Sequence, residues 1–414
     1  MANTLGVYNP IYYAQEALIW LAKALGLANR VHLGFDQERR TFDRGDTISI
    51  RRPSRLTVSD GGSAAQDLTT ETVSLVLDKW REVRFTLSDK ELAFTGPNTL
   101  ENPIIRDHIA PAAYALADDV DQKLAALVVG VPHAYIEPSA ALDPTVAGIL
   151  KTWKALFDLK CPTKDEANMH FMVGGQEHAA LAALAAFSQH QGAGDLGVQT
   201  QLRNQLGQRF GFNFFANQNR PTQAYANISD FAGAINNASG YAAGSTSIAV
   251  DGLGAAEVYN KGTILKMTSG ADAGSQYVIT ANATMSTGAA TITISPGLRN
   301  AVADNDTFAI GDLAALNQGA AATGAQDNVT NNLNLAFHRG WAALAMARLP
   351  DFGEHANRLG ANIVSVQDPV TGLAIRSRIH YLGSSSKIEV VLDICYGVKE
   401  LNPDLACRYE VQAA

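Results

Sequence analysis

The sequence predicts an α+β fold in which an all-β block is inserted into a host domain. The chain has 414 residues, which is enough for a sizeable core and for more than one domain. Two observations predict the host: residues 11–27 and 105–127 have apolar residues at helical spacing, and residues 47–51 and 72–77 alternate as strands do. A third predicts the block: five short strand-like segments follow one another between residues 235 and 315.

Composition excludes several classes of protein. The chain is 47% hydrophobic and 17% charged, and its net charge of −8 argues against a nucleic-acid binder of the basic kind. Its three cysteines, Cys161, Cys395 and Cys407, form no disulfide framework, so a reducing compartment is expected. The first residues lack the pattern of a signal peptide, and no run of about 18 apolar residues predicts a membrane span.

The first predicted element is an amphipathic helix over residues 11–27. Its apolar positions share one face, and Gln15 and Lys23 lie on the other: Ile11, Leu18, Leu21 and Leu25. The helix precedes any obvious core element. Two expectations stay open, packing on a neighbouring subunit or packing within its own domain.

The next elements are two strands, residues 47–51 and 72–77, joined by about twenty polar residues. Hairpin connections usually take about two to five residues, so this loop is either disordered or ordered by a partner subunit. Residues 30–55 carry seven arginines and four acidic residues, a net charge of +3 in an acidic protein. A complementary acidic surface on another copy is therefore expected.

A long helix with one buried stripe follows. Its apolar positions repeat at helical spacing: Ile109, Ala112, Leu116, Val120, Leu124 and Leu127. Pro111 either kinks this helix or opens its second half. Asp118, Asp119 and Asp121 are predicted to form its solvated face, and they place no third ligand for a metal ion.

Residues 134–230 are predicted to be mixed α and β. Residues 176–188 form an Ala-rich helix, and the aromatic segment 209–216 belongs to the core. In the block that follows, turn residues separate the five strands, as in a small barrel or sandwich: 245–250, 262–268, 275–281, 290–295 and 306–310.

After the block the sequence predicts a return to the host domain. Residues 331–348 are predicted to be helical, so the block is interpreted as an insertion at a surface loop. Residues 373–382 and 386–401 are predicted to pair as strands around a short turn rich in serine.

No motif predicts catalysis or metal binding. The phosphate-binding, dinucleotide-binding, nucleophile-elbow and zinc-protease motifs are absent from the sequence. His170, Glu177 and His178 match no ligand spacing. Residues 303–312 resemble a calcium loop only superficially, because Phe308 stands where an oxygen ligand is needed. The sequence therefore predicts no catalytic, cofactor-binding or metal-binding residues. It also predicts that the protein is not an enzyme.

Several stretches resemble the major capsid (coat) proteins of tailed double-stranded-DNA phages. TVSLVLDKWREVRFTLSDKEL (72–92) is similar to their β-to-helix passage, and IAPAAYALADDVDQKLAAL (109–127) to their long spine helix. RFGFNFFANQNRPTQ (209–223) resembles the segment that closes the first half of the apical domain. NNLNLAFHRGWAALAMARLP (331–350) resembles the helix after the insertion, and IEVVLDICYGVKELNPDLACRYE (388–410) the terminal strand and tail. The order covers nearly the whole chain and is most similar to the branch of the short-tailed Salmonella phages.

The resemblance implies an HK97-like capsid fold with an inserted all-β, barrel-like domain. The implied parts follow the chain: N-terminal arm, 1–45; extended loop hairpin, 46–84; spine helix and peripheral domain, 85–133; first part of the apical domain, 134–234; inserted β domain, 235–315; second part of the apical domain, 316–372; peripheral strands and C-terminal tail, 373–414.

The resemblance also implies a function. The chain would self-assemble through pentamers and hexamers into the icosahedral shell that encloses the phage genome. It would enclose the double-stranded DNA without sequence-specific binding, and no membrane would be involved. A scaffolding protein and a portal are expected partners, and a decoration protein is another. The protein would be assembled in the bacterial host cytoplasm and reside in the virion capsid. The expected inter-subunit contact residues lie in the arm and the loop: Trp20, Leu21, Arg51, Arg52, Arg55, Asp60 and Asp67.

Two other classes remain open at this point. One is an accessory virion protein, for decoration or for the tail. The other is an enzyme with an accessory β domain, in which a hidden site would show as stabilisation by a ligand.

Overall fold

A computed structural model describes residues 10–33, 47–51, 72–88, 90, 108–137, 143–189, 195–225, 230–311, 329–351, 361–368 and 372–413. The chain divides into two compact units, Met1–Leu124 with Ala342–Leu401, and Ala125–Trp341 with Asn402–Ala414. Both units mix helices with many strands. The seven-part division predicted from the sequence stays a prediction.

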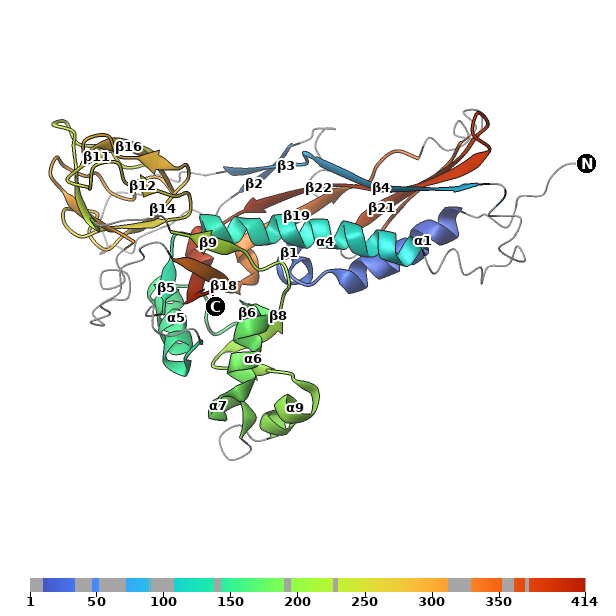
Figure 1. Cartoon of the computed structure of the whole chain (residues 1–414), viewed down its shortest axis with the longest axis horizontal. Helices are drawn as coiled ribbons and strands as arrows, with labels where there is room; N and C mark the ends of the chain where they lie inside the picture. The colour runs from blue at the N-terminus through green and yellow to red at the C-terminus, as the bar shows by residue number, and fades with distance from the viewer. Residues whose placement is uncertain are drawn as a thin grey trace, which may run out of the picture. The chain divides into compact units, whose positions relative to one another are not determined.

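The described part of the first unit contains a six-stranded sheet, a separate two-stranded sheet and helices. The strands of the larger sheet are in the order β1-β19-β22-β21-β20, and β4 also pairs with β22 (Figure 1). The strands are β1 (His32–Leu33), β4 (Lys79–Ser88), β19 (Ala342–Ala347), β20 (Ala361–Gln367), β21 (Ala374–Leu382) and β22 (Lys387–Glu400). The helices are α1 (Pro10–Ala24), the short η1 (Ala28–Arg30) and α4 (Ala110–Ala126).

Helix α1 packs inside its own unit. It contacts β20 and β21, and Ala14, Ala17 and Leu21 are fully buried. Both long helices were predicted from their spacing, and the structure confirms them. Pro111 lies in the first turn of α4, where its missing N–H removes no helical hydrogen bond.

The predicted hairpin is also present. Strands β2 (Thr47–Arg51) and β3 (Thr72–Val76) pair antiparallel, with Thr47 opposite Val76. Ile48, Ile50 and Leu75 pack against alanines of β19. A Cβ atom added to Gly397 would lie 2.2 Å from the carbonyl oxygen of Val76, so only glycine fits where β3 approaches β22. The loop between the strands lies outside the described residues.

The second unit is built on a mixed sheet in the order β5-β23-β18-β6-β8-β7, with β9 beside β18. The strands are β5 (Ala134–Ile136), β6 (Met169–Val173), β7 (Gln208–Arg209), β8 (Phe212–Ala216), β9 (Thr222–Ala224), β18 (Thr330–His338) and β23 (Ala406–Gln412). Its α-helices are α5 (Val146–Asp158), α6 (Gly175–Ala183), α7 (Ala185–Ser188) and α9 (Asp195–Arg203). Its 3-10 turns are η3 (Leu127–Gly130), η4 (Glu166–Asn168), η5 (Arg339–Trp341) and η6 (Pro403–Leu405). Aromatic rings of the predicted core segment pack here, such as Phe212 against Phe171.

The predicted helix over residues 331–348 is wrong. The segment forms β18, the turn η5 and β19. Strand β18 lies between β23 and β6, and its residues are buried on both faces. Strand β19 (AALAMA) is also buried on both faces and is apolar at every position, so its pattern resembles that of a buried helix.

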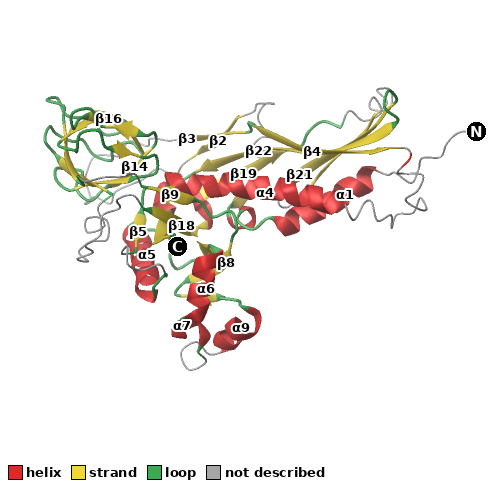
Figure 2. Ribbon diagram, viewed as in Figure 1, coloured by secondary structure: helices red, strands yellow, loops and turns green. Residues whose placement is uncertain are grey.

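The predicted all-β block contains a closed barrel of six strands, of which β14 and β16 are labelled in Figure 2. The strands are β10 (Ala232–Ile235), β11 (Ser247–Asp251), β13 (Ile264–Met267), β14 (Gln276–Ile279), β16 (Ala290–Ser295) and β17 (Thr307–Ile310). Two short strands, β12 (Val258–Tyr259) and β15 (Ala283–Thr284), pair beside them. The five predicted segments are all strands. The sixth, β10, begins before residue 235.

Within the described part of the chain, no helix is long and apolar enough to cross a membrane.

Candidate interaction surface

One face of the first unit's sheet carries alternating charges across β4, β22 and β21. The register places Glu82 opposite Asp393, and Asp393 opposite Arg376. Since alternate residues of a strand share a face, Arg84, Arg378, Glu389 and His380 lie on this face as well. We call this set, together with Trp80, the charged face.

The centre of the charged face is a buried ion pair. Arg376 donates from Nε to Asp393 Oδ1 at 2.9 Å and from Nη2 to Oδ2 at 2.5 Å. Arg378 Nη2 lies 3.2 Å from Asp393 Oδ2 and donates to Glu82 at 2.7 Å. Asp393 is fully buried. A bidentate arginine pair fixes both side chains strongly, so this centre is rigid.

A second group extends the charged face. Glu389 contacts Arg84 at 3.3 Å and His380 Nε2 at 2.5 Å. Three carboxylates therefore face three guanidinium groups, and each carboxylate has a cationic partner. Among the described residues no group of three or more potential ligands could hold a metal ion.

Trp80 stands on the charged face with most of its side chain in solvent. It is 59% exposed. Its ring lies over Arg376 at 5.9 Å, and its Nε1 donates to Asp393 Oδ2 at 3.1 Å. The indole is thus held in one position although it is exposed. Tryptophans of this kind are over-represented among the residues that dominate binding energy at protein interfaces.

Strand β4 is exposed along its length. It has ten residues, and β22 is its only strand partner within the described ranges. An edge strand presents unpaired backbone groups, and charges such as Arg81 and Arg84 protect it from unspecific pairing. On one face residues 80, 82, 84 and 86 are exposed; on the other face Arg81 is exposed and residues 83, 85 and 87 are half-buried. Strand β4 therefore offers both an edge and a face to a partner.

The structure places two of the predicted contact residues, Trp20 and Leu21, in different surroundings. The Trp20 ring lies 5.7 Å from that of Tyr114, and its Nε1 donates to Glu16 at 2.9 Å. Tyr114 is nearly half exposed, so this pair of rings lies at the surface. Leu21 is fully buried against its own unit, which corrects its assignment as an inter-subunit contact.

The other predicted contact residues belong to the hairpin. Arg51 is exposed at the end of β2. Arg52, Arg55, Asp60 and Asp67 lie outside the described residues.

The predicted solvated face of α4 is wrong for Asp121. This carboxylate is buried and accepts hydrogen bonds from the backbone N–H groups of Gly26, Leu27 and Ala28 at 2.7, 3.1 and 3.0 Å. Burial raises the pKa of Asp121, and the three N–H groups oppose that shift. Asp119 accepts from Tyr396 at 2.6 Å and pairs with Arg81 at 3.2 Å. Asp118 fits the prediction better, because its carboxylate contacts Gln122 at the exposed surface.

The histidines singled out in the sequence are part of the packing of the second unit. The His170 ring lies 5.6 Å from the Phe337 ring. Glu177 is buried, pairs with Arg220, and accepts from Asn332 at 2.9 Å. Burial lowers the pKa of His178. Glu177 is thus held by Arg220 and Asn332 within the packing of this unit.

The sequence interpretation missed Trp80 and the charged face. The signal was the alternation in KWREVRF, where residues 80, 82 and 84 share one side of a strand. Their partners on β22 and β21 lie about three hundred residues later in the chain, and no local pattern reveals that register.

No family model and no curated protein matches the chain. Solved structures are similar to it over most of its length. The structure of Mycobacterium phage Che8 has 12% identity and a TM-score of 0.46, with 93% of this chain and 90% of that chain covered. The capsid of Ralstonia phage GP4 has 10% identity and a TM-score of 0.43, with 90% and 85% covered. A virus-like particle from Pyrococcus furiosus has 8% identity and a TM-score of 0.35, with 96% and 98% covered.

Proposed function

We propose that this chain is the major capsid protein of a tailed phage, with an HK97-like fold and an inserted barrel. The observation that carries the proposal is the exposed strand β4 with its fixed Trp80. A fixed, exposed tryptophan on an open edge strand is a surface built for a protein partner. The order of helix, hairpin, long helix, barrel and terminal strands supports the capsid assignment, because it follows the resemblance found in the sequence.

The proposed mechanism is assembly through many repeated contacts. Each specific interface buries about 1,200–2,000 Å². A closed shell multiplies such contacts, so modest individual affinities produce a stable container. The net charge of −8 suits this role, since a strongly basic wall would hold packaged DNA by phosphate contacts.

The proposal extends to partners and location. Copies of the chain would form pentamers and hexamers in the virion capsid, after assembly in the host cytoplasm. A scaffolding protein and a portal are proposed partners, and a decoration protein is a further one. The chain would enclose double-stranded DNA without reading its sequence, and it would not act as an enzyme.

The test combines assembly with a substitution on the charged face. The full chain is expressed alone and together with candidate scaffolding proteins, then examined by sedimentation and negative-stain electron microscopy. Wild-type protein is expected to form shells, or spirals and tubes where scaffolding is missing. Trp80→Ala is expected to fold but to lose assembly, because truncating an interface tryptophan costs about 2 kcal/mol or more at each contact.

The conservative variant Trp80→Phe serves as the matched control. It keeps a ring over Arg376 and loses only the hydrogen bond to Asp393, so it is expected to assemble. A wild-type chain that stays a monomer or dimer under every condition would overturn the capsid proposal and favour an accessory role. Normal shells from Trp80→Ala would remove the charged face from the proposal.

A further inference from the structure

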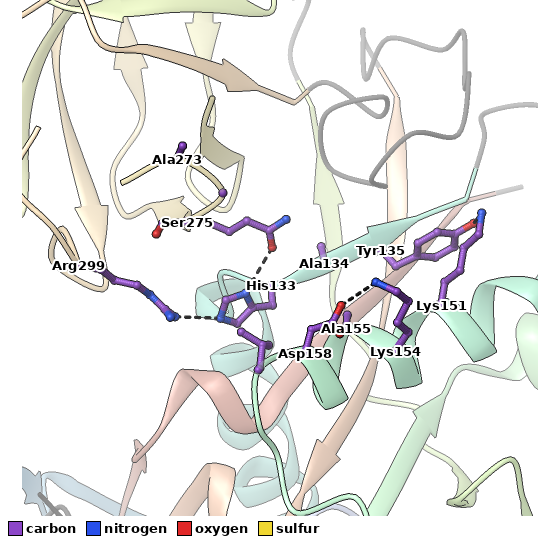
Figure 3. A pocket seen from close by; sticks show the side chains of 13 residues that line it. His133, Ala134, Tyr135, Lys151, Lys154, Ala155, Asp158, Ala273, Ser275 and Arg299 are labelled. Carbon is purple, nitrogen blue, oxygen red and sulfur yellow. Dashed lines mark hydrogen bonds and ion pairs between the residues drawn. The ribbon is translucent and has the colours of Figure 1, made fainter. Parts of the chain in front are cut away.

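A cavity of about 450 Å³ lies in the second unit, between α5, β5 and the loop before β14 (Figure 3). Its volume falls within the range of about 300–1,000 Å³ that is common for ligand pockets. Part of its wall is apolar: Ala134, Ala155, Leu159 and Ala273, beside the ring of Tyr135. Cationic side chains from two segments complete it, Lys151 and Lys154 from α5 and Arg299 from the barrel.

A network of hydrogen bonds holds the barrel side of this cavity in place. His133 Nε2 lies 3.1 Å from Asp404 Oδ1, and His133 Nδ1 lies 3.3 Å from Gln276 Oε1. Arg299 pairs with the same Asp404 oxygen and lies 3.3 Å from His133 Nε2. His133 and Asp404 are buried. This wall is therefore preorganised before any ligand arrives.

The cations of the cavity are not all neutralised. Lys154 pairs with Asp158 at 2.7 Å, and Arg299 pairs with Asp404. Lys151 has no acidic partner within the described ranges, and its Nζ reaches only the hydroxyl of Tyr135 at 3.5 Å and the ring of Tyr135 at 5.3 Å. One ammonium group is thus left to bind an anion in a partly apolar setting.

We propose that this cavity binds a short acidic peptide segment of a partner protein, with a carboxylate on Lys151 and aliphatic groups on the apolar wall. The site does not depend on shell formation and goes beyond the proposed function. Two features favour a peptide over a nucleic acid. Asp158 and Asp404 repel a dense row of phosphates, whereas a single carboxylate fits beside them. The small apolar wall suits aliphatic side chains better than a charged backbone.

The test uses the unassembled full chain and fluorescence anisotropy at low salt. The probe is a labelled peptide with one glutamate between two leucines, and its matched control replaces the glutamate with glutamine. The acidic peptide is expected to bind saturably, and the glutamine peptide is not. Lys151→Gln is expected to weaken binding about tenfold, since it removes a charge-assisted hydrogen bond.

Asp158→Asn gives a result that a folding defect would not produce. It frees Lys154 from its carboxylate, so the acidic peptide is expected to bind several-fold more tightly. Lys164→Gln, which changes an exposed lysine of the same unit outside the cavity, is expected to leave binding unchanged.

Inorganic phosphate and a single-stranded oligothymidylate are the competing probes. The proposal is overturned if the acidic peptide does not bind, if Lys151→Gln binds it like the wild type, or if Asp158→Asn weakens it. It is also overturned if the oligothymidylate displaces the peptide more effectively than unlabelled peptide does.

Discussion

At the residue scale, Asp121 shows how one buried carboxylate fixes the chain after α1. Its oxygens satisfy the three consecutive N–H groups of residues 26–28. Asp121→Ala would leave these donors without an acceptor, and a buried unsatisfied donor costs about 1–3 kcal/mol. We expect a clearly lower free energy of unfolding, measured by urea denaturation, and faster hydrogen exchange of these three amides.

Asp118→Ala is the matched control for Asp121, one helical turn away on α4. Its carboxylate accepts a hydrogen bond from Gln122 at the exposed surface, and substitutions at exposed positions usually change stability by less than about 0.5 kcal/mol. Equal effects of the two substitutions would contradict the role given to Asp121.

The three cysteines differ in burial, and that difference predicts their reactivity. Burial raises the pKa of Cys161 and of Cys407 to about 12, well above that of an exposed thiol. Cys395 is only partly buried. At pH 8 we expect a thiol reagent to label one cysteine in the native protein and three in urea.

The raised pKa values of Cys161 and Cys407 also determine the direction in which stability changes with pH. Because the folded pKa of both thiols lies above the unfolded value, the protonated form favours the folded state. This stabilisation is complete below about pH 9 and is lost as the pH rises towards 12. Rapid labelling of two native cysteines at pH 8 would contradict both expectations.

At the element scale, the sequence pattern predicted the helices and strands that have one face in the core and the other in solvent. The helices α1 and α4 and the strands β2 and β3 each have one buried face, so their periodicity is legible. Strands β18 and β19 are buried on both faces and were mistaken for a helix. In β18 the leucines 333 and 335 alternate with the asparagines 332 and 334, which is the signal of a strand.

The charged face could not be predicted in the same way. Its residues come from β4, β21 and β22, and their contacts depend on a register that only the assembled sheet defines. The sequence predicted seven contact residues, all in the arm and the hairpin. It did not include Trp80, because the partners that hold this indole, Arg376 and Asp393, lie about three hundred residues later in the chain.

A substitution at Gly397 tests how closely the hairpin packs against the sheet. Gly397→Ala would place a Cβ atom 2.2 Å from the Val76 oxygen, so β3 would have to move. We expect a loss of about 1–3 kcal/mol in the free energy of unfolding, as for other overpacked sites. Faster exchange of the β2 amides should accompany it. Gly383→Ala is the control, since nothing lies within 4 Å of the added Cβ; a loss of similar size there would refute this account.

At the scale of the whole molecule, the hairpin combines a base anchored in its own unit with a long polar connection. Ile48, Ile50 and Leu75 hold the base against β19. The residues of the connection are almost all polar or small, and they include the predicted contacts Arg55, Asp60 and Asp67. A connection of this composition adds little to a core of its own. Its length is explained if it binds a neighbouring copy.

Replacing Pro53–Thr70 with an Asn-Gly turn tests this explanation. Asn-Gly closes a two-residue hairpin, so β2 and β3 should keep their pairing and the subunit should fold. We expect an unchanged circular dichroism spectrum and urea midpoint, together with the loss of closed shells in electron micrographs. A variant with the same residues in scrambled order separates length from sequence: shells from it would assign the role to length, and their absence would assign it to particular side chains. Normal shells from the shortened hairpin would show that the connection is not needed for assembly, and the exposed strand β4 would then have to supply the contacts between subunits.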